Sequence, residues 1–422
     1  VLGESALDAS VSGGNNTAIG KDALTTLTSG TLNTALGGST LKVNTTGGSN
    51  VAVGASALIA NTTASNNVAV GKFAMVANTT GTQNVAIGSL ALDANTTAND
   101  NVAVGYTAGT ANTTGASNTF VGSESAIANT TGHSNAAFGK RSLYTNSTGA
   151  SNTALGKDAL YANTTASNNT AVGADALTAN TTGSNNTGIG SLALDANTTG
   201  GNNVAVGRTA LFSNTTASNN TACGYNSLRL NTAANNTAVG FDALKSNTTG
   251  TQNTAVGTLT LDANTSANYN TAVGYQALSS TTTGDLNTAV GQDCLRDNTT
   301  GESNVAVGLS ALRASTTADN NTAIGQSALK ENTTGHQNVA VGASALSVNT
   351  TGSHCVAVGR NALNANTTSS YNTAIGQNCL QANTTGVYNT ALGANALDAN
   401  TTRHNNTAIG YRALTNQSVA DQ

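Results

Sequence analysis

A 17-residue phrase repeats along nearly the whole chain, and one typical copy runs from Asn169 to Asn185. We number its positions from the first Asn, so that a glycine stands at position 5. This glycine recurs every 17 residues from Gly20 to Gly224, and again from Gly240 to Gly410; with Gly3 it marks 25 coils. Helical solenoids need about 33 residues or more for each repeat, so a phrase this short favours a solenoid of β structure.

Positions 2 to 4 of the phrase predict a strand. They read Thr/Val-Ala-Val/Ile, as in residues 170–172, and turn-forming residues bound them on both sides. We predict a second, weaker strand at positions 7 to 10, and a return turn at Asn-Thr-Thr-Gly in which Gly or Asn adopts any positive φ. The predicted fold class is therefore all-β, a parallel β-solenoid or β-roll of about 25 coils.

The array is predicted to be a single unit over residues 1–422, without a separate cap or globular domain. Its one break in phase lies between Gly224 and Gly240, where the spacing is 16 residues. We interpret the break as a one-residue deletion in the return turn, because loops tolerate such changes. Neither end carries a different segment, which favours end-to-end stacking of copies or continuation of the array.

Composition excludes several classes of function. Charged residues make up 8% of the chain and the net charge of -4 is spread thinly, so no basic stripe is present to bind nucleic acid. No apolar run is long enough for a membrane-spanning helix, so we expect no membrane insertion. The four cysteines form no CxxC pair, which argues against a disulfide scaffold.

Each position of the phrase should form a column along the stack. Position 9 is Leu in 22 of the 25 coils, the exceptions being Met75, Gly109 and Ala126. Position 1 is almost always Asn, which predicts a ladder of side-chain amides bonded from coil to coil. We assign to the structural core columns Ala171, Val172, Leu177, Val206, Leu211 and Phe120, and to the Asn ladder Asn152, Asn169, Asn186 and Asn203.

The coils that lack leucine at position 9 predict which positions of the phrase face each other inside the coil. Position 9 loses its large side chain at Gly109 and Ala126, and between them lies Phe120, a large residue in the otherwise small column at position 3. Because interiors are densely packed, one ring should fill the space that the missing leucines leave. Positions 3 and 9 should therefore face each other inside the coil, while positions 2 and 4 face a neighbouring chain.

An apolar residue on the outer side of the strand needs a cover. Positions 3 and 4 are both apolar, as in Ala205-Val206, whereas a strand with one wet face should alternate. The most economical cover is another copy of the chain, so we predict a homo-oligomer, with chains intertwined or side by side.

The repeat resembles known fibre sequences. The phrase Asn-Thr/Val-Ala-Val/Ile-Gly-x-x-Ala-Leu is similar to the head repeats of trimeric autotransporter adhesins of the YadA type. The longer phrase Asn-Thr-Ala-x-Gly-x-x-Ala-Leu-x-x-Asn-Thr-Thr-Gly resembles arrays in tail-fibre-like proteins. The resemblance covers essentially all 422 residues. It implies a homotrimeric fibre, extracellular or on a cell or virion surface, that projects a binding element towards a host-surface or matrix receptor or glycan.

We expect no catalytic, metal or cofactor site. Asp93, Asp195, Asp262 and Asp398 share position 10 but lie many coils apart, whereas catalytic groups must converge. His133, His336 and His404 share position 16 and His354 stands at position 17, all in the polar return turn. We interpret these histidines as solvated turn residues, because a metal needs several ligands in one place.

Two further patterns leave alternatives open. Nineteen coils carry Asn-x-Ser/Thr at position 12, from Asn44 to Asn400. These are either glycosylation sequons or, as we favour, repeated turn caps. The threonines at positions 13 and 14 predict an alternative function, ice binding, although positions 10, 11, 16 and 17 beside them vary. A structural or adhesive fibre shaft remains the main prediction, and a polysaccharide-active β-helix ranks last.

Overall fold

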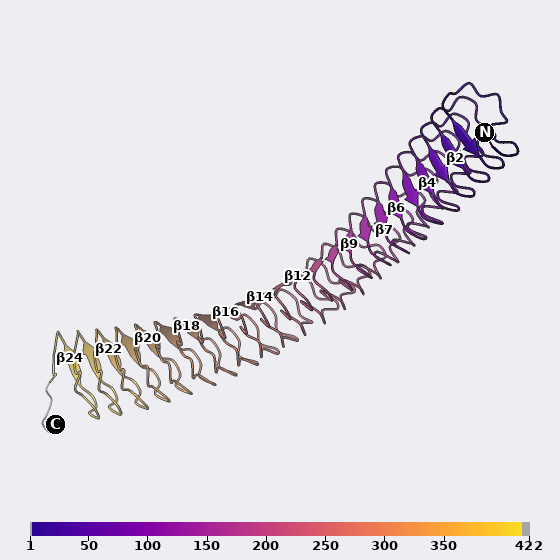
Figure 1. Cartoon of the computed structure of the whole chain (residues 1–422). Helices are drawn as coiled ribbons and strands as arrows, with labels where there is room; N and C mark the ends of the chain where they lie inside the picture. The colour runs from indigo at the N-terminus through magenta and orange to yellow at the C-terminus, as the bar shows by residue number, and fades with distance from the viewer. Residues whose placement is uncertain (1, 416–422) are drawn as a thin grey trace. The chain divides into compact units, whose positions relative to one another are not determined.

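The structure, a computed structural model, describes residues 2–415. The fold is all-β: 24 parallel strands, each three residues long and one in each coil from the second onward, form a β-solenoid with a 17-residue repeat, and no helix occurs within the described residues. Figure 1 shows the strands as a column of arrows along one side of the coils. The residues fall into two compact units that divide between Ser218 and Asn219. Residues 1 and 416–422 of the predicted array lie outside the described residues.

The strands of the first unit are β1 (Thr17–Ile19), β2 (Thr34–Leu36), β3 (Val51–Val53), β4 (Val68–Val70), β5 (Val85–Ile87), β6 (Val102–Val104), β7 (Thr119–Val121), β8 (Ala136–Phe138), β9 (Thr153–Leu155), β10 (Thr170–Val172), β11 (Thr187–Ile189) and β12 (Val204–Val206). The strands of the second unit are β13 (Thr221–Cys223), β14 (Thr237–Val239), β15 (Thr254–Val256), β16 (Thr271–Val273), β17 (Thr288–Val290), β18 (Val305–Val307), β19 (Thr322–Ile324), β20 (Val339–Val341), β21 (Val356–Val358), β22 (Thr373–Ile375), β23 (Thr390–Leu392) and β24 (Thr407–Ile409).

Within each unit the strands stack in register, one coil apart. Thr170 of β10 pairs with Thr153 on one side and with Thr187 on the other, so equal positions of the phrase lie above one another. The short coil keeps this register, because Thr221 of β13 pairs with Thr237 of β14. Its turn absorbs the missing residue: Asn231 Nδ2 donates to the carbonyl of Ala233, two residues ahead, at 2.6 Å. Strand pairing, rather than repeat length, therefore fixes the columns.

The predicted second strand at positions 7 to 10 is absent, and these residues form turns. The physical reason is a positive φ at positions 7 and 9, which is 57° at Asp175 and 52° at Leu177. A left-handed conformation is costly for a leucine, and an extended strand does not contain it. Burial of the Leu177 side chain, which is 0% exposed, offsets this cost.

The positive φ values also lie elsewhere than predicted. Asn180 and Gly183 of the return turn do not adopt them, whereas positions 5, 7, 9 and 17 do. Gly173, at position 5, has φ 135°, and a Cβ on it would lie 2.7 Å from the backbone carbonyl carbon of Gly190 in the next coil. The close approach of successive coils and the unusual φ together require glycine at this position.

The core consists of thin columns inside the coils. Ala171, Leu177 and Leu211 are fully buried, as predicted. Position 3 packs on position 9 of the preceding coil, since a Cβ on Gly188 would lie 3.3 Å from Leu177 Cδ1.

Val172 and Val206 are not part of this interior, contrary to their assignment to the core columns. Both end their strands at position 4 and are only half-buried in the single chain. The reason is the alternation of side chains along a strand: position 3 points inward, so positions 2 and 4 point outward.

Phe120 lies inside the coil, as predicted. Its side chain is 0% exposed, and a Cβ on Gly109 would lie 2.7 Å from Phe120 Cδ2. The ring therefore occupies space that a leucine fills in other coils, while Val121 is half-buried on the outer side. This exchange confirms that positions 3 and 9 share one interior.

We predict that Phe120→Ala lowers the free energy of unfolding by about 3 to 5 kcal/mol, because it leaves a cavity beside Gly109. Adding Gly109→Leu to this variant should recover part of the loss, since Leu adopts the same left-handed conformation in other coils. Gly109→Leu alone should destabilise the chain by overpacking. Chemical denaturation followed by circular dichroism measures all three; equal effects of Gly109→Leu in both backgrounds would contradict the shared interior.

Candidate functional site

The outward side of the strands carries a row of apolar side chains that are partly exposed. We call the side chains at positions 2 and 4 of all strands the strand face. Position 4 is Val, Ile or Leu in nearly every coil, and in interior coils the exposed fraction is, for example, 47% at Leu155 and 45% at Leu392. Because the coils are in register, these side chains form continuous apolar columns within each unit.

Cys223 belongs to the strand face and is exposed, whereas Cys294, Cys355 and Cys379 are buried. Burial raises the pKa of the Cys294 thiol to about 12 and the pKa values of Cys355 and Cys379 to about 11. All four thiols are free. The thiolate is the reactive form of cysteine, and burial disfavours it. Cys223, the exposed cysteine, is therefore the one that a thiol reagent can reach in the folded chain.

The predicted Asn ladder at position 1 is present, and it does more than join side-chain amides. Asn169 accepts at its Oδ1 the backbone N–H of Asn186 at 2.9 Å, and its Nδ2 donates to the carbonyl of Gly183 at 2.9 Å. The first bond joins consecutive coils, and the second closes one coil on itself. Asn152 and Asn186 repeat both bonds, and Asn203 Nδ2 donates to the carbonyl of Ala217.

A second Asn ladder runs along position 12. Asn180 donates from Nδ2 to Asn163 Oδ1 at 3.0 Å and to the carbonyl of Gly183 at 2.9 Å. The Gly183 carbonyl therefore accepts from both ladders. The ladder is interrupted where the next coil has no asparagine at position 12. Asn264 Oδ1 has no hydrogen-bond partner, because position 12 of the next coil is Thr281. The sequence favoured a turn cap at position 12. The bond from Asn180 Nδ2 to the carbonyl of Gly183, three residues ahead in the same turn, is of this kind.

The position-12 sequons are inaccessible in the folded chain. Their asparagines are buried, and Asn180 itself is 0% exposed. An oligosaccharide attached to Nδ2 would remove one of the two N–H donors that make these bonds, and it would not fit inside the coil. The geometry therefore favours the structural interpretation of these nineteen sites over glycosylation.

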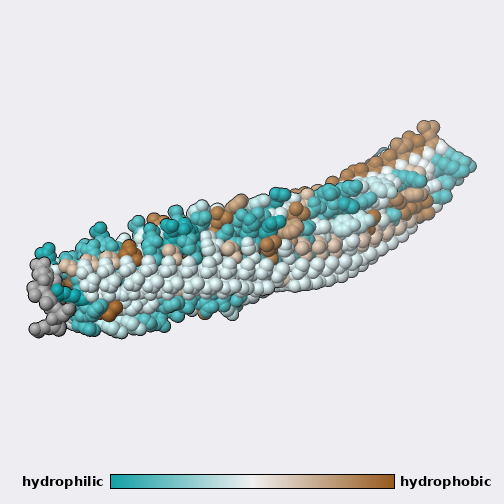
Figure 2. Space-filling view, turned by 90° about the horizontal axis from the view of Figure 1, so that it is seen from below, coloured by the Kyte–Doolittle hydropathy of each residue, from teal (hydrophilic) through white to brown (hydrophobic). Residues whose placement is uncertain are grey.

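Threonines at positions 13 and 14 line a second exposed side. Thr181 Oγ1 donates to the carbonyl of Thr198 in the next coil at 3.0 Å, and the same bond recurs along the column. Thr182 at position 14 is exposed, as are most other residues of its column. Figure 2 shows an even, pale band with the weak hydropathy of threonine, serine and glycine, bordered by hydrophilic rows. The hydroxyl orientation at position 13 is thus fixed by the backbone.

The four histidines lie in the return turns, and two of them, His336 and His354, stand in consecutive coils. His336 Nδ1 accepts the backbone N–H of Asp319 at 3.0 Å, and His404 Nδ1 accepts that of Val387 at 2.9 Å. His133 contacts Ser134, and His354 stacks on Tyr371. Within residues 2–415, no group of three His, Cys, Asp or Glu side chains is arranged to hold a metal ion.

The position-10 carboxylates are also dispersed. Burial raises the pKa values of Asp93, Asp195 and Asp262 above the usual range for aspartate. Each lies several coils from the others, so no two of them share a substrate-sized site.

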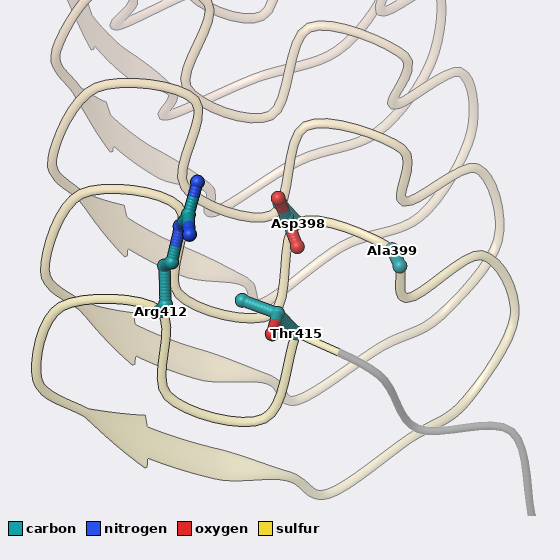
Figure 3. A pocket seen from close by; sticks show the side chains of 4 residues that line it. All are labelled: Asp398, Ala399, Arg412 and Thr415. Carbon is teal, nitrogen blue, oxygen red and sulfur yellow. The ribbon is translucent and has the colours of Figure 1, made fainter.

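An open cleft of about 330 Å³ lies where the described chain ends, and it is lined by Asp398, Ala399, Arg412 and Thr415. Figure 3 shows Asp398 and Arg412 on neighbouring coils, both directed into the notch between the turns. Among the described residues, this cleft brings together one carboxylate, one guanidinium and the hydroxyl of Thr415.

Sequence analysis missed the stacked aromatic rings. Tyr144 and Tyr161 stack with ring centroids 4.9 Å apart, and Tyr371 and Tyr388 stack at 5.1 Å. The available signal was two tyrosines 17 residues apart, at one position of consecutive coils. In-register stacking brings such pairs together automatically.

Comparison with known proteins gives no match: no protein-family model matches the chain, and no curated protein matches it. Among residues 2–415, no helix has the length and apolar character needed to cross a membrane.

We predict that Asn180→Ala destabilises the chain, because Asn163 Oδ1 and Asn197 Nδ2 each lose a buried partner. The cost should be about 1 to 3 kcal/mol for each group left unpaired. Thr182→Ala, two residues away on the threonine side, is the matched control and should change the free energy of unfolding by less than about 0.5 kcal/mol. Urea denaturation compares the variants; equal midpoints would show that the ladder at position 12 contributes little.

Proposed function

We propose that this chain is a structural or adhesive fibre shaft that assembles from several copies and projects or spaces a binding element outside the cell or virion. The strand face is the observation that carries the proposal. A continuous apolar column is costly to leave in water, and contiguous apolar patches larger than a few hundred Å² on soluble proteins generally mark interaction sites.

A second copy of the chain is the partner that fits this surface best. The strand face repeats with the coil, so only a partner with the same axial repeat can cover it at every coil. Another copy in parallel alignment has this repeat by construction. We favour three copies around one axis, because the repeat resembles trimeric adhesin heads and because closed rotational symmetry leaves no strand face uncovered.

The proposal involves no enzymatic activity. The position-10 carboxylates lie several coils apart, and His336 and His354, although in consecutive coils, belong to no group of three metal-ligating side chains within residues 2–415. Surface variability instead lies at positions 6, 7, 10, 11, 16 and 17, where the residue type changes from coil to coil. Such a variable exposed surface suits recognition of a receptor or glycan, while the buried columns keep the shaft stable.

We predict that lysine at three points of the strand face, Val239→Lys, Val273→Lys and Val290→Lys, dissociates the oligomer, because burying unpaired charges at the interface is costly. These valines are 36%, 36% and 37% exposed in the single chain, so the fold of the single chain should tolerate lysine at these positions. The matched control places lysines in the same coils on the threonine side: Thr249→Lys, Thr283→Lys and Thr300→Lys.

Analytical ultracentrifugation, with circular dichroism to confirm folding, compares these variants with the unmodified chain. We expect a trimer for the unmodified chain and for the control, and a smaller species for the strand-face variant. Short bismaleimides should also link copies through Cys223, and Cys223→Ser should abolish the link. A stable monomer of the unmodified chain at micromolar concentration would overturn the proposal.

A second candidate function, ice binding, is favoured by the threonine columns. Fixed hydroxyls at position 13 and small side chains at position 14 give a repeating, uncharged surface on which water can order. The same two triple variants separate the functions. Thermal hysteresis that is lost with lysines at Thr249, Thr283 and Thr300 but kept with lysines on the strand face would support ice binding; no hysteresis in the unmodified chain would exclude it.

A further inference from the structure

The second unit carries a stack of three exposed rings at position 17. His354, Tyr371 and Tyr388 belong to consecutive coils, and their ring centroids lie 4.8 and 5.1 Å apart with interplanar angles of 3° and 12°. Tyr371 is 50% exposed and Tyr388 is 57% exposed. Both tyrosines have the same left-handed backbone conformation, with φ of 61° and 57°. Their phenol groups are thus accessible to solvent, nearly parallel, and adjacent to each other on consecutive coils.

We propose that Tyr371 and Tyr388 form an oxidative modification site, at which a peroxidase and hydrogen peroxide join the two rings as dityrosine within one chain. Each phenol loses one hydrogen atom to give a phenoxyl radical, whose unpaired electron is partly located on the carbons beside the hydroxyl group. Two such carbons form the new bond, and the rings regain aromaticity by shifting their hydrogens to oxygen. The two hydrogen atoms removed reduce one hydrogen peroxide to two water molecules.

The stack favours coupling inside the chain over coupling between chains. A phenoxyl radical on Tyr371 has the ring of Tyr388 beside it at all times, whereas a radical on an isolated tyrosine must meet another chain. The outer edges of both rings remain in solvent, so an oxidant can reach them. The resulting bond would tie two consecutive coils together, and separation of these coils would then require breaking a covalent bond.

Tyr269 provides a matched control within the same column. It also stands at position 17, is 56% exposed and has φ 60°, but Gln252 and Leu286 occupy position 17 of the adjacent coils. It has the same accessibility without a ring beside it in its column. Tyr144 and Tyr161 provide a second comparison, because they stack at 4.9 Å but are less exposed, and the Arg141 guanidinium lies 5.4 Å from the Tyr161 ring centroid.

The test treats the purified full chain, at low concentration, with a haem peroxidase and hydrogen peroxide. Trypsin then releases residues 361–403 as one peptide, in which Tyr371 and Tyr388 are the two tyrosines. Coupling within the chain lowers the mass of this peptide by two hydrogen atoms. Coupling between chains instead links two peptides, so mass spectrometry separates the outcomes whether the chain is a monomer or an oligomer.

We expect dityrosine fluorescence to appear together with the lighter peptide, at a rate that does not depend on chain concentration. Tyr371→Phe keeps the ring stack but removes one phenol, and it should abolish the lighter peptide. Tyr269→Phe should leave it unchanged. An unaltered mass for residues 361–403, or products that are only linked peptide pairs with a yield rising with chain concentration, would overturn the proposal.

Discussion

Hydrogen bonds directed along the stack, from each coil to the next, are the interaction on which this structure depends. The coils are too thin to bury a thick core, and their interior consists of alanine and leucine columns. Backbone bonds between coils, such as Thr170 N–H to the Asn186 carbonyl at 2.8 Å, must therefore recur at nearly every position. The two asparagine ladders add side-chain bonds in the same direction and meet at one carbonyl in each coil.

This dependence explains which residues the repeat keeps. A coil that changed its path would lose bonds to both neighbours, so the residues that fix the path are nearly constant. Gly173 is an example, because the next coil lies too close for a side chain and φ is unfavourable for other residues. The removal of one residue is tolerated near Asn231. There the Asn231 side chain bonds to the carbonyl two residues ahead instead of three, and the strand register stays intact.

The strand and the interior could be predicted from the sequence, because both follow from side-chain shape. β-branched residues between turn formers marked positions 2 to 4, and the exchange of size between Gly109 and Phe120 identified the shared interior. The second strand could not be excluded in this way, because the left-handed conformation of Leu177 leaves no trace in residue type. Val172 and Val206 were assigned to a core that, in the single chain, they do not enter.

The same register decides what kinds of site this fold can carry. A residue type repeated in every coil becomes a stripe, as on the strand face and the threonine side, whereas a residue repeated in only two or three coils becomes a local site. The stacked tyrosines are of the second kind. Catalysis and metal binding require groups that converge in one place, and the position-10 carboxylates Asp93, Asp195 and Asp262 lie several coils apart.

Hydrogen exchange measured by mass spectrometry tests the central claim most directly, because it reports backbone hydrogen bonds along the chain. If each coil is held by bonds to its neighbours, peptides covering residues 17–409 should show slow exchange at the strand of every coil, including the short coil from Tyr225 to Gly240. Interior strands that exchange as fast as the same peptides in the unfolded chain would contradict this account.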